Sequence, residues 1–360
     1  MGLAGMAPIL LLLFNRPDLT EGLIACLRRA APEQLFIAID GPRVGVESDS
    51  ERVNEVRQLA EAIDWQCEKR WLIRERNLGC GLAVSGAITW FFDQVEEGII
   101  LEDDCHPDPT FFQFSSFMLE KYRDDARVFM VSGTSLLPDS VHLFNPYYFS
   151  KYMGIWGWAC WRRAWKAYDY NLASLSAGEW ENLVRARSAN AVECRYWLHI
   201  LELMLAGKID TWDFQVQFCA WKEDALHLTS SRNLVENFGF RGDATHTKGH
   251  SPLAERRAQS NPPPYAEVPV LADESLDRIV FGEKLHASLA LAEWLFGESQ
   301  ERERARQVER LSADLVEAQS RIGQLSSEIA SLNGEIQSER SELARYYGFS
   351  GALRCLRKMF

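Results

Sequence analysis

The chain lacks the patterns that mark several common classes of protein. Its 360 residues include eight cysteines, but no two of them have the Cys-x-x-Cys spacing of zinc sites and dithiol redox centres. Scattered cysteines of this kind are typical of reduced, structural thiols in a cytosolic protein. The early apolar run "ILLLLF" at 9–14 is far shorter than the roughly 20 residues of a membrane-spanning helix. It has no basic leader and ends at Asn15-Arg16-Pro17, so we expect no signal peptide there.

Positive charge is also scarce. The chain has 39 Lys and Arg against 51 Asp and Glu, a formal net charge of -12 and a sequence pI near 5.2. Such a chain is a poor candidate for binding nucleic acid through a general basic field. With 47% hydrophobic and 25% charged residues, the composition predicts a soluble, cytoplasmic protein with one large domain and an appendage.

The first hundred residues alternate short apolar runs with longer amphipathic segments. Each run is closed by a breaker, which is typical of buried strands in a parallel sheet. Strands that alternate with helices imply an α/β fold with helices on both faces of the sheet. We expect strands at 7–14, 34–42, 70–77 and 98–104, and helices at 18–30, 47–64 and 78–95.

Polar residues follow all four predicted strands. They are Asn15-Arg16, Asp40, Arg76-Asn77 and the triplet Glu102-Asp103-Asp104. Ligands of open α/β sheets bind beyond the carboxyl ends of the strands. Three adjacent carboxylates repel one another unless a cation lies beside them, and a divalent metal on a nucleotide diphosphate would supply it. The alternative for the triplet alone is a solvated acidic turn.

The second half is less regular and rich in aromatic residues. Many of the twelve tryptophans lie between Trp156 and Trp221, which indicates an aromatic-lined pocket or a bulky core. We expect a strand at 127–135, a loop at 147–168 that leads into a short helix, helices at 193–206 and 209–221, a loop at 232–247 and a proline-rich arm at 251–270.

The last segment has a different pattern. Apolar residues recur at alternating spacings of three and four between Val308 and Leu343, with polar residues between them. This heptad pattern predicts a coiled coil and therefore a homo-oligomer. The basic and apolar tail after Gly348 could rest on the inner face of a membrane, or it could be a frayed terminus. The sequence thus predicts a domain at 1–250, an arm and helix at 251–296, a coiled coil at 297–346 and a tail at 347–360.

Four stretches of the first half carry a family resemblance: "LLFNRPD", "IAIDGPR", "RNLGCG" and "GIILEDDCHPDPTFFQF". They resemble the motifs of GT-A fold, nucleotide-sugar-dependent glycosyltransferases. Within that group the chain is most similar to bacterial relatives of the Golgi enzyme that adds the first branching N-acetylglucosamine to N-glycans. "GIWGWACWRRAW" is similar to a further Gly-Trp segment of that family. The resemblance covers about residues 7–250, and it is looser in the second half.

The resemblance implies a GT-A fold and a set of site residues. It implies Mn²⁺ or Mg²⁺ as the cofactor and UDP as the carrier of the donor sugar. Donor contacts would come from Arg16, Asp40, Asn77, Gly79, Glu102, Asp103, Trp156 and Trp158, metal ligands would be Asp104 and His246, and the catalytic base would be Asp213.

Each of these residues has a structural alternative. Arg16 and Asp40 could be turn residues, Asn77 and Gly79 a plain loop, and the tryptophans core. Asp213 could cap its own helix, and His246 could be a loop histidine. The gap between Trp158 and Asp213 is longer here than in the Golgi enzyme.

The implied reaction is single displacement with inversion, since Asp213 alone would act as base and no second carboxylate would act as nucleophile. The acceptor could be a glycan, a lipid-linked glycan or a protein. Two rival functions stay open. A sugar-phosphate nucleotidyltransferase would need a glycine-rich basic stretch after the first strand, which "FNRPDLTEG" lacks. A non-catalytic scaffold assembled by the coiled coil would not need the carboxylate triplet.

Overall fold

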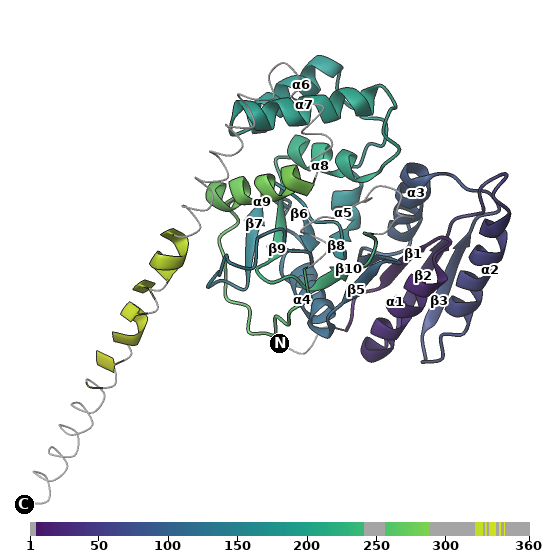
Figure 1. Cartoon of the computed structure of the whole chain (residues 1–360), viewed down its shortest axis with the longest axis horizontal. Helices are drawn as coiled ribbons and strands as arrows, with labels where there is room; N and C mark the ends of the chain where they lie inside the picture. The colour runs from purple at the N-terminus through teal and green to yellow at the C-terminus, as the bar shows by residue number, and fades with distance from the viewer. Residues whose placement is uncertain are drawn as a thin grey trace, which may run out of the picture. The chain divides into compact units, whose positions relative to one another are not determined.

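The computed structural model describes residues 5–240, 256–287 and parts of 321–342. The chain divides into two compact units, one of residues 1–137 and 143–295, the other of 138–142 and 296–360. The larger unit holds both sheets and helices α1 to α9 (Figure 1). The four-part domain division expected from the sequence stays a prediction.

The main sheet has eight strands in the order β3-β2-β1-β4-β8-β6-β9-β7. Strands β1 to β4 run parallel, whereas β8 is antiparallel to both β4 and β6, and β7 is antiparallel to β9. A small sheet pairs β5 with β10. The strands are β1 (Ile9–Leu13), β2 (Gln34–Ile39), β3 (Glu68–Ile73), β4 (Glu97–Glu102), β5 (Cys105–Pro107), β6 (Val128–Ser132), β7 (Tyr147–Ser150), β8 (Trp158–Trp161), β9 (Leu226–Ser230) and β10 (Val235–Asn237).

Helices cover both faces of this sheet, which confirms the α/β fold (Figure 1). The helices are α1 (Pro17–Ala30), α2 (Glu47–Glu61), α3 (Cys80–Phe92), α4 (Pro109–Lys121), α5 (Arg162–Trp165), α6 (Ala177–Arg187), α7 (Ala191–Leu205), α8 (Asp213–Lys222) and α9 (Glu274–Ala287).

Strand β1 shows why a central strand of this sheet is apolar throughout. Ile9, Leu11 and Leu13 belong to the core shared with α1, α2 and α4. Leu10 and Leu12 belong to the opposite core, shared with α3, α5 and α8. Because successive side chains point to opposite faces, a strand covered on both sides needs apolar residues at every position.

The loop expected at 147–168 is wrong in part, because it contains two strands. β7 pairs with β9, and β8 lies in the middle of the sheet between β4 and β6. Each strand has four residues, all buried, so neither shows the polar–apolar alternation of a half-buried strand. Trp158 and Trp161, at the two ends of β8, pack in the cores on opposite faces of the sheet. This fits the interpretation of these tryptophans as a bulky core. Strands β5 and β9 and helices α4 and α6 were not predicted either, and the loop expected at 232–247 contains the three-residue strand β10, which pairs with β5.

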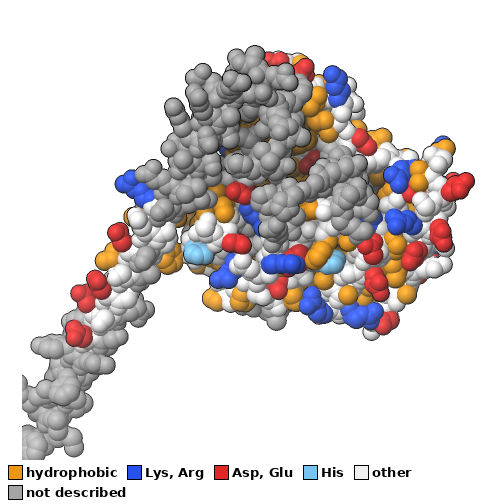
Figure 2. Space-filling view, viewed as in Figure 1, with side chains coloured by type: hydrophobic (Ala, Val, Ile, Leu, Met, Phe, Trp, Pro, Cys, Tyr) orange, Lys and Arg blue, Asp and Glu red, His pale blue; other side chains and the backbone are white. Residues whose placement is uncertain are grey.

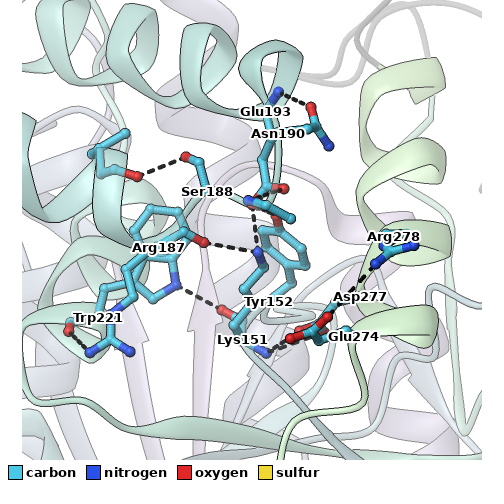
Figure 3. A network of polar contacts seen from close by, with 12 residues as sticks. Lys151, Tyr152, Arg187, Ser188, Asn190, Glu193, Trp221, Glu274, Asp277 and Arg278 are labelled. Atoms are coloured by element: carbon cyan, nitrogen blue, oxygen red, sulfur yellow. Dashed lines mark hydrogen bonds and ion pairs between the residues drawn. The ribbon is translucent and has the colours of Figure 1, made fainter.

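A buried polar cluster joins the end of β7 to the helices of the second half; we call it the Lys151–Glu193 network (Figure 3). Lys151 Nζ donates to Glu193 Oε1 at 2.6 Å and to the carbonyl of Arg187 at 2.9 Å. The hydroxyl of Tyr152 also donates to Glu193. Asp277 of α9 accepts from Ser150 Oγ at 2.5 Å and from the backbone N–H of Lys151. The network therefore fixes α6, α7 and α9 to the edge of the sheet.

On the surface in view, basic and acidic side chains of the described residues are interspersed (Figure 2). Exposed ion pairs such as Arg57–Glu61 at 2.8 Å and Arg70–Glu68 at 2.9 Å are examples of this mixing. Among the described residues, none of the helices has the length and apolar character needed to cross a membrane.

The described parts of the smaller unit between 321 and 342 are helical. Three of the heptad positions there, Leu325, Ile329 and Leu332, are 51%, 43% and 55% exposed. The rest of the predicted coiled coil and the tail lie outside the described residues.

Candidate active site

A cavity of about 350 Å³ opens at the carboxyl ends of the parallel strands. Its apolar part comes from β1, β2 and α3, including Leu12, Ala38 and Ala83. Six of the residues predicted to bind the donor line this one cavity: Arg16, Asp40, Asn77, Gly79, Glu102 and Asp103. These six residues follow four strands that are far apart in the sequence. The sequence predicts only that they lie at one edge of the sheet, and in the fold they line the same cavity.

In the part of the chain that the structure describes, Arg16 is the cation that contacts the carboxylate triplet. Its guanidinium forms a two-pronged pair with Asp103, with Nε at 3.0 Å from Oδ2 and Nη2 against Oδ1. Nη2 also lies 3.0 Å from Asp104 Oδ2. Although burial opposes the charged form of Arg16, the carboxylates of Asp103 and Asp104 raise its pKa above the ordinary value. Arg16 is therefore a fixed positive charge at this site.

Among the described residues, one guanidinium faces three carboxylates. Burial, and then the neighbouring Asp104, raise the pKa of Glu102 to about 8. Burial also raises the pKa of Asp103, to about 6, against the lowering effect of Arg16. Negative charge is thus unfavourable at these positions, and a bound cation would stabilise the ionised carboxylates.

The donor set suits a hard divalent cation, because carboxylate oxygens are the ligands that Mg²⁺ and Mn²⁺ prefer. Asp104 is 9% exposed, and its Oδ1 accepts a long hydrogen bond from Asn237 Nδ2 at 3.4 Å. The backbone of Gly239 passes close to it, since a Cβ there would lie 2.2 Å from Asp104 Oδ2. No cluster of three His, Cys, Asp or Glu side chains arranged for a metal occurs among the described residues. His246, the other predicted ligand, lies outside them.

Asp40 holds the loop that precedes α3. Its carboxylate accepts from Asn77 Nδ2 at 2.8 Å and from the N–H of Leu78 at 3.2 Å. Burial raises the pKa of Asp40, while the hydrogen bonds from the Leu78 and Gly41 backbone act to lower it. Asn77 Oδ1 in turn accepts from the N–H of Gly79 at 3.1 Å. The predicted nucleoside-facing residues thus form one connected loop on the cavity wall.

The N-terminus of α3 also reaches the cavity, and a carboxylate already binds it. Asp210 accepts from the N–H of Cys80 at 3.1 Å and from that of Gly81 at 2.9 Å. Sequence reasoning on "RNLGCG" suggested contact between this glycine-rich turn and a ligand. In the structure the two amides bind a side chain of the same protein.

Asp213 is the first residue of α8 and is partly exposed. The residue at the N-cap position is Trp212, with no side-chain cap bond, so Asp213 does not cap its own helix. Its carboxylate accepts from the hydroxyl of Thr211. It lies near enough to the cavity to contribute, after burial and other carboxylates, to the raised pKa values of Glu102 and Cys80.

The two predicted tryptophans do not line the cavity. Trp158 is 1% exposed and stacks on Trp212, with ring centroids 5.6 Å apart. It is a core residue, so a direct sugar contact through its ring does not fit the structure. Trp156 is partly buried and lies edge-on to Phe240, with centroids 5.3 Å apart.

Other charged residues of the cavity wall were not among the predicted site residues. They are Arg43, Arg52, Arg74 and Asp210. Arg43 pairs with Asp49, with Nε 2.6 Å from Oδ2, and its hydrogen bonds lower the pKa of Asp49 to about 2. Arg43 and Arg74 stand in the strand-end stretches "IAIDGPR" and "RWLIRERN", so the rule that located Asp40 and Asn77 could have found them. Asp210 gives no such signal.

No family model and no curated protein sequence matches the chain. Among solved structures, the chain is similar to one titled "The Crystal Structure of UDP-glucose pyrophosphorylase complexed with UDP-glucose". The TM-score is 0.33 and the identity 10%, over 62% of this chain and 90% of the other. The fold assignment rests instead on the strand order and on the helices that cover both faces of the sheet.

Proposed function

We propose that the protein is a glycosyltransferase that moves a sugar from a nucleotide-diphosphate donor, UDP by resemblance, to an acceptor hydroxyl. One observation carries the proposal: six residues predicted as donor contacts line a single cavity at the carboxyl edge of the sheet. Its volume of about 350 Å³ lies within the range of small-molecule sites.

The cavity offers a place for each part of such a donor. The apolar wall of Leu12, Ala38 and Ala83, beside the Asp40 loop, would take the nucleoside. Arg16 would lie by the diphosphate as a permanent positive charge. Mn²⁺ or Mg²⁺ would be held by Asp104, with Glu102 and Asp103 close by, and when bound would offset the charge of the leaving diphosphate.

Asp213 is the proposed general base. As the acceptor oxygen bonds to the anomeric carbon, the bond from that carbon to the diphosphate oxygen breaks. The hydroxyl proton passes to the Asp213 carboxylate, and the nucleoside diphosphate leaves with the electron pair. Single displacement of this kind inverts the anomeric centre.

The decisive experiment is a screen of donor hydrolysis and transfer over a panel of nucleotide sugars, with and without Mn²⁺. We expect release of nucleoside diphosphate from one class of donor. Asp104→Ala should weaken donor binding and abolish its Mn²⁺ dependence in calorimetry. Release of nucleoside triphosphate on addition of pyrophosphate would instead identify a nucleotidyltransferase, and the absence of nucleotide binding in thermal-shift assays would identify a scaffold.

The proposal includes self-association through the heptad segment. Leu325, Ile329 and Leu332 are exposed in the single chain, as expected of a seam that a partner helix would cover. Removing residues 297–360 should leave a folded, nucleotide-binding monomer. Light scattering that finds the full chain monomeric at micromolar concentration would contradict this part of the proposal.

A further inference from the structure

Asp210 links two parts of the site that are far apart in the sequence. It lies three residues before Asp213, yet its carboxylate binds the N–H groups of Cys80 and Gly81, about 130 positions earlier. The first N–H groups of a helix have no partner within the helix. A carboxylate there satisfies two of them and also interacts favourably with the helix dipole.

The turn before α3 is shaped to admit this carboxylate. Gly79 has a φ of +80°, and a Cβ there would lie 2.6 Å from Asp210 Oδ2. A Cβ at Gly81 would lie 2.7 Å from Asp210 Oδ1 and 2.8 Å from the carbonyl of Thr211. Both glycines of "RNLGCG" therefore allow the segment with Asp210 and Thr211 to approach the helix end. A side chain at either position would push that segment away.

The contact continues on both sides. On one side, Gly79 donates to Asn77, and Asn77 donates to Asp40, on the donor-binding wall. On the other, Thr211 donates to Asp213, and Gln215 Nε2 donates to the carbonyl of Thr211 at 2.9 Å. A continuous series of hydrogen bonds and peptide units thus joins the nucleoside-facing loop to the proposed base.

We propose that Asp210 is a positioning residue, which holds the segment with Asp213 against the N-terminus of α3 so that the base has a fixed place relative to the bound donor. The inference rests on the proposed function. It also means that the N-terminus of α3, the usual place for a phosphate, is filled by the protein itself. The diphosphate would then have to bind elsewhere in the cavity, beside Arg16 and the ion that Asp104 would hold.

The test compares Asp210→Ala and Asp210→Asn with wild type. We call the contact of the Asp210 carboxylate with the N–H groups of Cys80 and Gly81 the Asp210 clamp. Its loss should lower kcat by roughly 10- to 100-fold, since a small displacement of a reacting group has an effect of that size. The donor dissociation constant should change much less than kcat, because Asp40 and Arg16 keep their own hydrogen-bond partners. Asp210→Asn keeps one acceptor oxygen, so its kcat should lie between those of wild type and Asp210→Ala.

The matched control is Asp108→Ala. Asp108 caps α4 through the N–H of Thr110 at 2.8 Å and does not line the cavity. This substitution removes a helix cap of the same kind, and kcat should stay normal. If Asp210→Ala weakens donor binding as much as it lowers kcat, Asp210 contacts the donor directly and the positioning role is wrong. Unchanged kcat in Asp210→Ala also overturns it.

A double-mutant cycle with Gly79→Ala tests the contact itself. The added methyl should lower kcat in wild type through both backbone strain and displacement of Asp210. In the Asp210→Ala background only the strain remains, so the fold-loss should be smaller. Equal fold-losses in the two backgrounds would show that the two residues are not coupled.

Amide hydrogen exchange separates this inference from the proposed function, because it needs no substrate. Asp210→Ala should speed exchange in peptides covering 77–83 and 208–215, while Asp108→Ala should leave both unchanged. If exchange rises but no nucleotide sugar is ever turned over, the clamp stands and the glycosyltransferase proposal fails. If exchange in both peptides stays at the wild-type rate, the clamp is wrong whatever the reaction.

Discussion

The carboxylate triplet and the Lys151–Glu193 network are both buried groups of acids with a basic partner, but their charges are matched differently. In the network, Glu193 Oε1 receives Lys151 and Tyr152, and Oε2 receives the N–H of Ala189 at 3.0 Å. In the triplet, three carboxylates share one guanidinium among the described residues, and the pKa of Glu102 rises to about 8. The Lys151–Glu193 pair has one charge of each sign, so breaking it would leave a buried charge without a partner, whereas the surplus of carboxylates in the triplet favours a bound cation.

This comparison predicts that substitutions at the cavity change activity and those in the network change stability. The largest effect should come from Asp213→Asn, which keeps size but cannot accept a proton. Transfer should fall by roughly 10²- to 10⁴-fold, with unfolding midpoint and donor affinity near wild type. Steady-state kinetics paired with calorimetry check this. A rate close to wild type would place the base elsewhere, with Asp169 or Asp210 next to examine.

Glu193→Ala should have the largest effect on stability. It leaves the Lys151 ammonium, 17% exposed, without its carboxylate, and breaking a buried pair in this way costs about 3–5 kcal/mol. Urea unfolding should show the loss, while kcat per folded molecule stays normal. Replacing Lys151 by Met in the same chain should restore part of the stability. A Glu193→Ala protein as stable as wild type would mean that the network does not hold the helices to β7.

Asp277 gives the network a pH dependence. Burial raises its pKa from 3.8 to about 6, so the folded state binds this proton more tightly than the unfolded state does. Its contribution is therefore fully present below about pH 4 and is lost as the pH rises through 6. The loss is at most about 3 kcal/mol, because one pKa unit corresponds to about 1.4 kcal/mol.

Asp277→Asn should remove that pH dependence. The melting temperature of Asp277→Asn minus that of wild type, measured from pH 4 to 7.5, should increase with pH. Above about pH 7 this difference should be constant. Parallel curves for the two proteins would contradict the assignment of the shift to Asp277.

The smallest effect is expected where charges are exposed. Arg57 and Glu61 pair at 2.8 Å on the surface of α2, with each side chain 49% exposed. Pairs of this kind contribute about 0.3–0.5 kcal/mol. Glu61→Gln should leave activity unchanged and shift the urea midpoint only slightly, and even that shift should vanish in high salt. A loss of stability as large as that of Glu193→Ala would contradict the expected difference between exposed and buried ion pairs.

The part of the fold that could be predicted from the sequence is the part with local signals. Strands β1, β2 and β4 contain continuous apolar runs, β3 ends in the apolar run 71–73, and β1 to β3 are each followed by a breaker and a helix. Strands β7 and β8 were missed because their identity depends on pairing with strands formed much earlier or later in the chain. Four buried residues such as Trp158–Trp161 fit a core loop, a helix turn or a strand equally well.

The same distinction applies to the candidate site. Arg16, Asp40 and Asn77 follow strands, so their meeting in one cavity is a consequence of parallel topology. Asp210 has no such position, and only the folded chain brings it to Cys80 and Gly81. The family resemblance implied a donor contact for Trp158, but in the structure its ring lies in the core, stacked on Trp212.

The place of β8 has a consequence for synthesis on the ribosome. β4 pairs with β1 on one side, but its other neighbour, Trp158–Trp161, begins 56 residues after Glu102. At a synthesis rate of roughly 5–20 residues per second, this edge of β4 stays unpaired for roughly 3–11 s before β8 is made. An unpaired strand edge invites pairing with other nascent chains. Translation speed between residues 102 and 158 should therefore affect how much of the protein reaches the native state.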